Sequence, residues 1–144
     1  MTKVSSKKRP FNADHSFATD TVDLAAFFPD LEEWPKSWRG SDDDILPGEQ
    51  IVECFRPFLR FLATTYSKRT IRNHADNLWI LGGELIRDLN ETPKLRKMPI
   101  DKLLFDLVQD GGPVLHHADS EERMQSFEAT CNKFHRFLES TGAC

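Results

Sequence analysis

Apolar residues recur at helical spacing over residues 71–89, and this pattern restricts the possible folds more than any other feature of the chain. The steps between them alternate between four and three residues, which places them on one face of an α-helix. Strand signals are weak, because Leu and Phe total 26 while the β-branched Val and Ile total 11. We therefore predict an all-α fold. The stripe consists of Ile71, Ala75, Leu78, Gly82, Leu85 and Leu89.

The same spacing predicts a helix before this one, from about Pro47. Its apolar face is formed by Ile51, Phe55, Phe58, Leu59 and Leu62. Pro57 lies inside the pattern and should kink or split the helix, because proline has no N–H and clashes with the preceding turn. Ser67 is a suitable N-cap for the helix that follows, which should end near Asn90.

Two more helices are expected toward the C-terminus. The third begins at Pro99 and is closed by Gly111 and Gly112, and the fourth has Asp119 as its N-cap and ends at Gly142. The buried stripe of the third contains Ile100, Leu103, Leu104, Leu107 and Val108. That of the fourth contains Met124, Phe127, Cys131, Phe134, Phe137 and Leu138. Residues 47–142 should thus form one domain of four main helices.

Gly82 and Gly83 lie inside the second of these helices. Each costs roughly 1 kcal/mol relative to alanine in a helix interior. We expect the close approach of another helix to compensate for this cost. A bend or a ligand contact is the alternative, although the spacing does not match a phosphate-binding loop.

Residues 1–46 form a polar N-terminal arm. Residues 1–20 have no periodicity and are expected to be largely disordered, residues 22–28 suggest a short helix, and residues 31–49 suggest an irregular linker or lid. Asp42, Asp43 and Asp44 are expected in a solvated turn. Trp34 and Trp38 either anchor the arm to the domain or form an exposed partner-binding motif.

The net charge of −4 counts against a generic nucleic-acid binder, but it conceals alternating blocks. Residues 1–10 carry +4, residues 11–50 carry −8, residues 51–97 carry +4 and residues 98–144 carry −4. The one basic block of the helical domain therefore lies between acidic neighbours.

The three cysteines, Cys54, Cys131 and Cys144, are widely spaced and odd in number. They favour free thiols in a reducing compartment. We find no apolar stretch long enough for a membrane span and no secretory signal pattern. The sequence therefore predicts a cytoplasmic protein without membrane contact.

The order of the helical motifs resembles the SAM-like N-terminal domain of phage integrases and other tyrosine recombinases, also called the core-binding domain. The motifs are FRPFLRFLATT, SKRTIRNHADNLWILGGELI and SFEATCNKFHRFLESTG. The matching positions are Ser67, Thr70, His74 and Leu78, followed by Phe134, Phe137, Leu138 and Gly142. The resemblance covers residues 47–142 and implies a four-helix, SAM-like domain that grips DNA.

The chain also departs from that family. The family commonly has tyrosine where this chain has His74, and the segment 31–46 and the loop GGPVLHH are not part of its pattern. The resemblance further implies a separate catalytic domain with a nucleophilic tyrosine, whereas the only tyrosine here is Tyr66. We therefore expect a non-catalytic protein, which accompanies a recombinase of a mobile element or is a remnant of one.

The basic start of the second helix supplies the candidate DNA contacts. Cationic side chains bind phosphates, a helix N-terminus adds free amides, and Arg72 or Asn73 could reach a base edge. The predicted DNA-binding residues are Lys68, Arg69, Thr70, Arg72, Asn73, Lys133 and Arg136, with Arg56 and Arg60 as further candidates. The alternative is an ordinary solvated face whose cations pair with neighbouring acids.

Other chemistry has weaker support. His116–His117 and the Cys131/His135 pair are the only metal-like spacings, and neither supplies the four ligands of a closed zinc site. We predict no metal, no cofactor and no enzymatic activity. The alternative function is a protein-interaction or regulatory module on the same scaffold, docking through the acidic arm with Trp34 and Trp38.

Overall fold

The computed structural model describes residues 23–115 and 119–142, and these residues contain helices and no strand. This confirms the all-α class, while the specific SAM-like arrangement stays a prediction. Among the described residues, no helix is both long and apolar enough to span a membrane. The α-helices are α1 (Leu24–Phe27), α2 (Trp34–Trp38), α3 (Ile45–Thr65), α4 (Lys68–Glu91), α5 (Ile100–Leu107) and α6 (Glu121–Thr141). Short 3-10 turns occupy η2 (Leu31–Glu33), η3 (Asp42–Asp44), η4 (Pro93–Lys97) and η5 (Gln109–Gly111).

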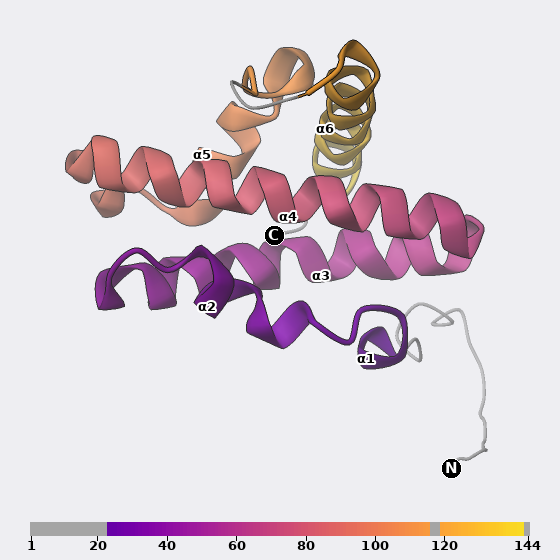
Figure 1. Cartoon of the computed structure of the whole chain (residues 1–144), viewed down its shortest axis with the longest axis horizontal. Helices are drawn as coiled ribbons and strands as arrows, with labels where there is room; N and C mark the ends of the chain where they lie inside the picture. The colour runs from indigo at the N-terminus through magenta and orange to yellow at the C-terminus, as the bar shows by residue number, and fades with distance from the viewer. Residues whose placement is uncertain (1–22, 116–118, 143–144) are drawn as a thin grey trace.

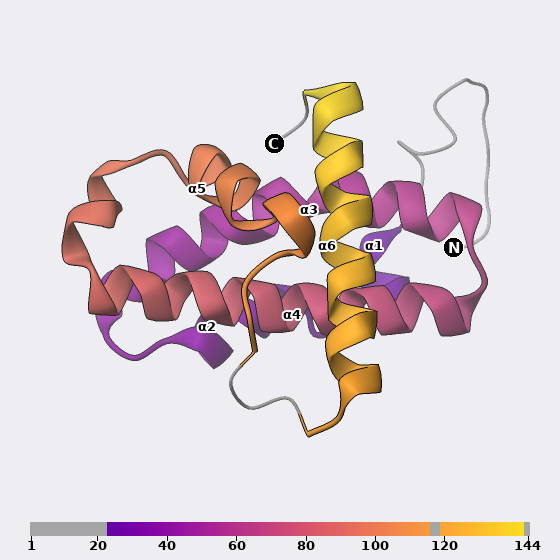
Figure 2. The same cartoon turned by 90° about the horizontal axis from the view of Figure 1, so that it is seen from above.

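Helices α3 and α4 form an antiparallel hairpin at the centre of the molecule (Figure 1). The arm, with α1 and α2, packs along one side of this hairpin. Helices α5 and α6 lie on the other side, and α6 crosses α4 steeply (Figure 2). The hairpin is therefore the middle layer, and both outer layers bury their apolar faces against it.

Phenylalanines of α3 and α6 form the centre of the core. The Phe134 ring lies 5.5 Å from that of Phe55 and 5.0 Å from that of Phe58, measured between ring centroids. All three side chains are fully buried. Pro57 lies within α3, which continues from Ile45 to Thr65, so of the two expected outcomes, a kink or a split, the split does not occur. The stripes expected on the first two helices are buried throughout.

The helix ends agree only in part with the sequence patterns. Ser67 caps α4 as predicted, and Gly142 ends α6 in the left-handed conformation with φ of 64°. The N-cap of α6, however, is Ser120 rather than Asp119, because the Ser120 side chain accepts the amide hydrogen of Arg123. Pro99, the expected first helical residue, is instead the N-cap of α5, and the helix begins one position later at Ile100.

The arm from residue 23 is ordered and belongs to the core. Trp34 is 8% and Trp38 is 9% exposed, and both join the same buried cluster as α3 and α4. The expected irregular linker instead forms η2, α2 and η3 before α3 begins at Ile45. Residues 1–20, where disorder was expected, lie outside the described residues.

The arm packs against the two glycines of α4 through the Trp38 ring. A Cβ atom added to Gly82 would overlap the Trp38 ring, whereas one added to Gly83 would lie 3.4 Å from it, at ordinary contact distance. The Trp38 Nε1 donates a hydrogen bond to the Trp79 carbonyl oxygen at 2.9 Å. The predicted close approach is therefore correct, and the approaching element is α2.

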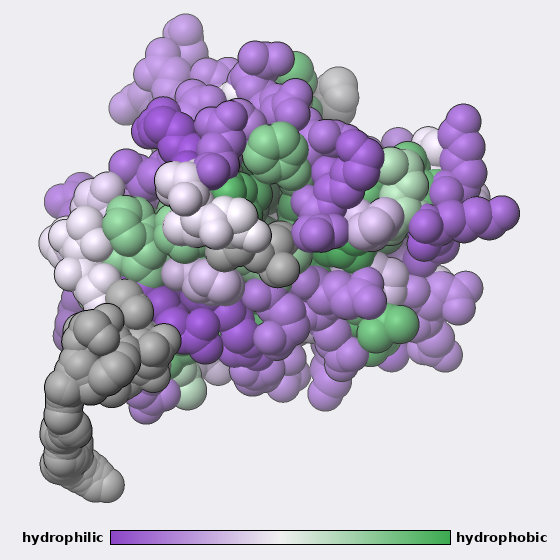
Figure 3. All heavy atoms as spheres, turned by 180° about the vertical axis from the view of Figure 1, so that it is seen from behind, coloured by the Kyte–Doolittle hydropathy of each residue, from purple (hydrophilic) through white to green (hydrophobic). Residues whose placement is uncertain are grey.

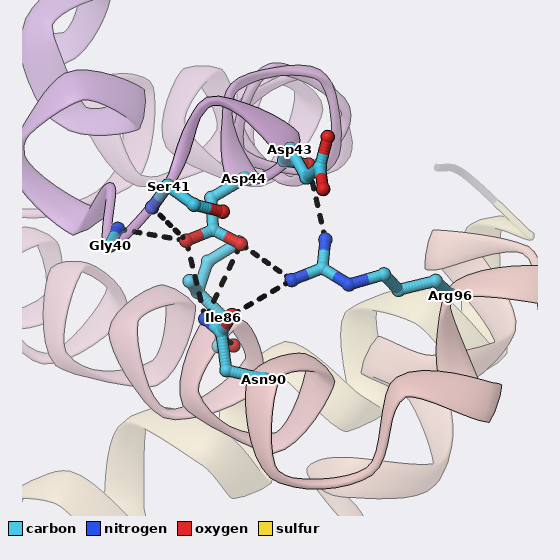
Figure 4. A network of polar contacts seen from close by, with 7 residues as sticks. All are labelled: Gly40, Ser41, Asp43, Asp44, Ile86, Asn90 and Arg96. Carbon is cyan, nitrogen blue, oxygen red and sulfur yellow. Dashed lines mark hydrogen bonds and ion pairs between the residues drawn. The ribbon is translucent and has the colours of Figure 1, made fainter.

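Asp44 is fully buried, which corrects the expectation of a solvated turn for all three aspartates. Its carboxylate accepts hydrogen bonds from the amides of Gly40 at 2.8 Å and Ser41 at 3.1 Å. It also accepts from Asn90 at 3.2 Å and from Arg96 at 2.7 Å (Figure 4). Arg96 and Asn90 are themselves joined at 3.0 Å, so the network ties the arm to the end of α4 and to η4.

The hydrogen bonds of this network decide the pKa of Asp44. Burial by itself would raise the pKa, but the hydrogen bonds from Arg96, Gly40, Asn90 and Ser41 outweigh it and lower the pKa to about 2. Such bonds favour the ionised form over the protonated form. Asp44 is therefore a charged structural link.

The expectation of free thiols holds for only one of the two described cysteines. Cys131 is free and buried, and burial together with Glu128 raises the pKa of its thiol to about 12. Cys54 is disulfide-bonded.

Candidate nucleic-acid interface

The N-terminus of α4 is exposed where the hairpin turns (Figure 1). The Ser67 hydroxyl accepts the amide hydrogen of Thr70 at 3.4 Å, and the Ser67 carbonyl accepts that of Ile71 at 2.9 Å. Within the described part of the chain, the amides of Lys68 and Arg69 have no such acceptor. The positive end of the helix therefore presents two donors to a ligand.

Three cationic residues lie at the same end of α4. Lys68, Arg69 and Arg72 are exposed, and none forms an ion pair with any residue in 23–115 or 119–142. Asn73 is also exposed, while Thr70 is half-buried and receives a hydrogen bond from Ser67 at 3.2 Å. The alternative of cations paired with neighbouring acids does not describe these three side chains.

Arg56 and Arg60, the further candidates on α3, differ from each other. Arg56 donates to Glu53 at 2.7 Å and to Glu32 at 2.8 Å, so it joins α3 to the arm. Arg60 is half-buried and has no ion-pair partner among the described residues. Only Arg60 therefore remains available for a phosphate.

Helix α6 brings its two predicted cations to the same end of the hairpin. Lys133 donates from Nζ to the Tyr66 hydroxyl at 3.0 Å, and its Nζ lies 5.0 Å from the Tyr66 ring centroid. Tyr66 directly precedes the cap of α4. Arg136, three residues further along α6, is exposed and has no described ion-pair partner. The structure thus brings Lys133 of α6 beside the residue that precedes α4, while no contact places Arg136 against α4.

His74 connects α4 to α6 beneath this surface. Its Nδ1 lies 2.7 Å from the Thr130 hydroxyl, and its ring lies 6.1 Å from that of Tyr66. Burial and the nearby Lys133 lower the pKa of His74. Asn77, one turn further along, donates to the same Thr130 hydroxyl at 2.9 Å. Sequence reasoning missed Asn77 and Thr130 because polar residues on a helix carry no signal of the crossing helix.

The predicted partner-binding residues lie elsewhere. The rings of Trp34 and Trp38 lie 6.0 Å apart, and the Trp34 ring meets Phe55 edge-on at 6.3 Å. Both belong to the core, as in the anchoring interpretation. Neither ring is therefore exposed as a free docking motif on the folded domain.

The described residues hold no group of three or more His, Cys, Asp or Glu side chains arranged to bind a metal ion. Cys131 is buried in the α6 stripe, and the His135 ring lies 4.9 Å from that of Phe105. The His116–His117 pair lies outside the described residues.

Comparison with protein-family models, with curated proteins and with solved structures finds no match to this chain.

Proposed function

We propose that this protein binds double-stranded DNA through the N-terminus of α4, assisted by α6. The observation that carries this proposal is the group of three cations, Lys68, Arg69 and Arg72, which have no acidic partner in the described chain and lie at the same helix end as two unbonded amides. Phosphate groups match this combination, because they accept from both guanidinium groups and helix N-terminal amides.

Helices α4 and α6 contribute different contacts to the bound DNA. Phosphate contacts from α4, with Lys133 and Arg136 from α6, set the position of the domain on the duplex without reading its sequence. Arg72 and Asn73 project from the next turn of α4 and supply the groups that contact guanine or adenine edges. Tyr66 orients Lys133 through the hydrogen bond at 3.0 Å, so this cation is held in place before DNA arrives.

The resemblance to the recombinase core-binding domain supports the same proposal. It implies DNA recognition that is linked to the integration or recombination of a mobile element. A recombinase that supplies the catalytic domain is the partner expected on this view. The resemblance concerns short motifs in residues 47–142, and the charge arrangement of α4 supports DNA binding independently of it.

The test is the salt dependence of binding to a blunt duplex, measured by fluorescence anisotropy. The variant Lys68→Ala/Arg69→Ala/Arg72→Ala should lose at least about tenfold in affinity at low salt, and its log–log salt slope should fall by about 3. The matched control is Lys36→Ala/Arg87→Ala/Lys102→Ala, which removes the same charge from cations that are paired with acids. The proposal fails if wild type does not bind at low salt, or if the control loses as much as the α4 variant.

The burial of Trp34 and Trp38 favours DNA binding over the alternative of a protein-interaction module. Truncation at residue 46 would not test that alternative, because it would remove core residues such as Leu31 and Trp38. Surface changes at Glu33 and Asp42, which are exposed, are the better probe. Charge reversal at both positions should leave duplex binding intact if the arm serves the fold.

A further inference from the structure

A groove with a volume of about 470 Å³ lies between the arm and the first half of α4. Its apolar part is formed by Phe28, Leu31, Trp34 and Ala75, and Arg123 from the start of α6 also lines it. A smaller hollow of about 240 Å³ adjoins the other side of Arg72 and is lined by Lys68. Volumes of roughly 300–1,000 Å³ are typical of small-molecule sites.

Trp79 supplies an aromatic surface in this groove. Its side chain is 42% exposed, although the other two tryptophans are buried. Its Nε1 donates to the Ser37 hydroxyl at 2.8 Å, and that hydroxyl donates to the Trp34 carbonyl at 2.7 Å. The hydrogen bonds fix the orientation of the indole and satisfy its only donor. What Trp79 offers a ligand is therefore a preorganised ring surface.

Charged groups of both signs line the same groove as Trp79. Arg72 and Arg123 line the groove, and neither has an ion-pair partner among the described residues. The carboxylates of Asp30 and Asp76 also line it and are likewise unpaired within residues 23–115 and 119–142. A ligand that matched this lining would carry an anionic group, a flat ring and hydrogen-bond donors.

We propose that this groove binds a nucleotide whose base carries an amino group. The base stacks on Trp79, as bases do on aromatic side chains in single-strand sites. The phosphate accepts hydrogen bonds from Arg72 and Arg123, whose planar guanidinium groups suit phosphate oxygens. The amino group donates to Asp76 or Asp30, as the cytosine amino group does to acidic side chains.

This inference deepens the proposed function and rests on it for the choice of a nucleic-acid ligand. The same chemistry could come from two sources, a free mononucleotide or an unpaired nucleotide that extends from a bound duplex. The groove shares only Arg72 with the duplex-binding surface. Trp79 and Arg123 are therefore the residues that separate the two sites.

The first experiment titrates the full chain with deoxycytidine 5′-monophosphate and follows heat by calorimetry and tryptophan fluorescence. We expect saturable binding with quenching of Trp79. Arg123→Ala should weaken binding about tenfold, and Trp79→Leu should weaken it at least as much by calorimetry, with the fold checked by circular dichroism. Lys102→Ala, which removes an exposed cation of α5 paired with Asp106, is the matched control and should bind as wild type does.

Two further ligands test the individual contacts. Deoxyribose 5-phosphate lacks the base and should bind at least about tenfold more weakly, and thymidine monophosphate, which lacks the amino group, should bind several-fold more weakly. Equal affinity for deoxyribose phosphate or for thymidine monophosphate would overturn the proposal. So would an unchanged affinity in Arg123→Ala, or an acidic hexapeptide that binds the groove more tightly than the nucleotide.

A comparison of duplexes separates the two sources. A duplex with a three-nucleotide cytosine extension should bind more tightly than the blunt duplex if the site serves DNA, and Arg123→Ala should abolish only that difference. Mononucleotide binding without such a difference assigns the site to free nucleotides. If the blunt duplex does not bind while the mononucleotide does, the proposed function fails and the groove assignment stands.

Discussion

The cations at the two ends of the α3–α4 hairpin differ in whether they are paired with acidic side chains. At the end where α4 finishes, Arg96 donates to the buried Asp44 and to Asn90, and it also reaches the Asp43 carbonyl at 3.1 Å (Figure 4). At the turn, Lys68, Arg69 and Arg72 have no acidic partner among the described residues. A cation whose charge is already paired holds the fold together, whereas an unpaired cation is available to a ligand.

The hydropathy of the surface does not show this contrast. Seen from behind, hydrophilic side chains cover most of the visible face, with apolar patches between them (Figure 3). Average composition therefore does not locate a binding site on this molecule. The pairing state of each cation is the more informative property, because a paired Arg must first break its ion pair before it can bind phosphate.

The largest expected effect comes from removing the Asp44 carboxylate, which lies at the end of the hairpin where α4 finishes. Asp44→Ala should lower the free energy of unfolding by about 3–5 kcal/mol, because it leaves a partly buried charge and several amides without their acceptor. Urea unfolding followed by circular dichroism measures this loss. Asp42→Ala is the matched control, since Asp42 is 97% exposed, and it should change stability by no more than about 0.5 kcal/mol. Equal effects of the two variants would contradict the structural role of Asp44.

Acid titration tests the same end without removing an atom. The pKa of Asp44 is about 2 when folded and 3.8 in the reference state, so its contribution is fully present above about pH 4 and is lost as the pH falls toward 2. The difference corresponds to about 2 kcal/mol. Unfolding free energies measured between pH 2 and pH 5 should show this slope. Asp44→Asn should flatten it, and an unchanged slope would argue against the lowered pKa.

The packing of the arm against α4 can be weakened at Gly82, which the Trp38 ring contacts. Gly82→Ala should destabilise the protein by about 1–2 kcal/mol, because overlap with the Trp38 ring outweighs the helix propensity that alanine adds. Gly83→Ala is the matched control and should be neutral or slightly stabilising, since its Cβ would lie at contact distance. Thermal unfolding compares the two variants. A more stable Gly82→Ala variant would mean that the Trp38 ring does not rest on this glycine.

The smallest expected effect on stability concerns His74, in the first half of α4. Burial and Lys133 lower the pKa of His74 below 6.5, so the unfolded chain binds a proton before the folded chain does. Stability should therefore decrease modestly as the pH falls below about 6.5. NMR titration of the imidazole and unfolding at pH 5–7.5 measure both quantities. His74→Gln should remove this dependence, whereas His135→Gln, with its ring on Phe105, should keep it.

The periodicity of the sequence predicted the four long helices and most of their buried faces. Caps were predictable where the pattern is local, as at Ser67 and Gly142, but not where two residues competed, as at Ser120 and Asp119. The glycine pair of α4 signalled close packing correctly. The arm was interpreted as irregular because its short helices contain too few residues to show a period.

The candidate site was predictable only as a list of residues. The sequence by itself determined that α4 begins with a basic turn, because helix propensity, capping and charge are local properties. Only the tertiary structure decided which cations are paired, because pairing depends on side chains distant in sequence, such as Asp44 with Arg96 or Glu32 with Arg56. For the same reason, only the packed chain shows Asp44 buried, Trp79 exposed and a groove beside it.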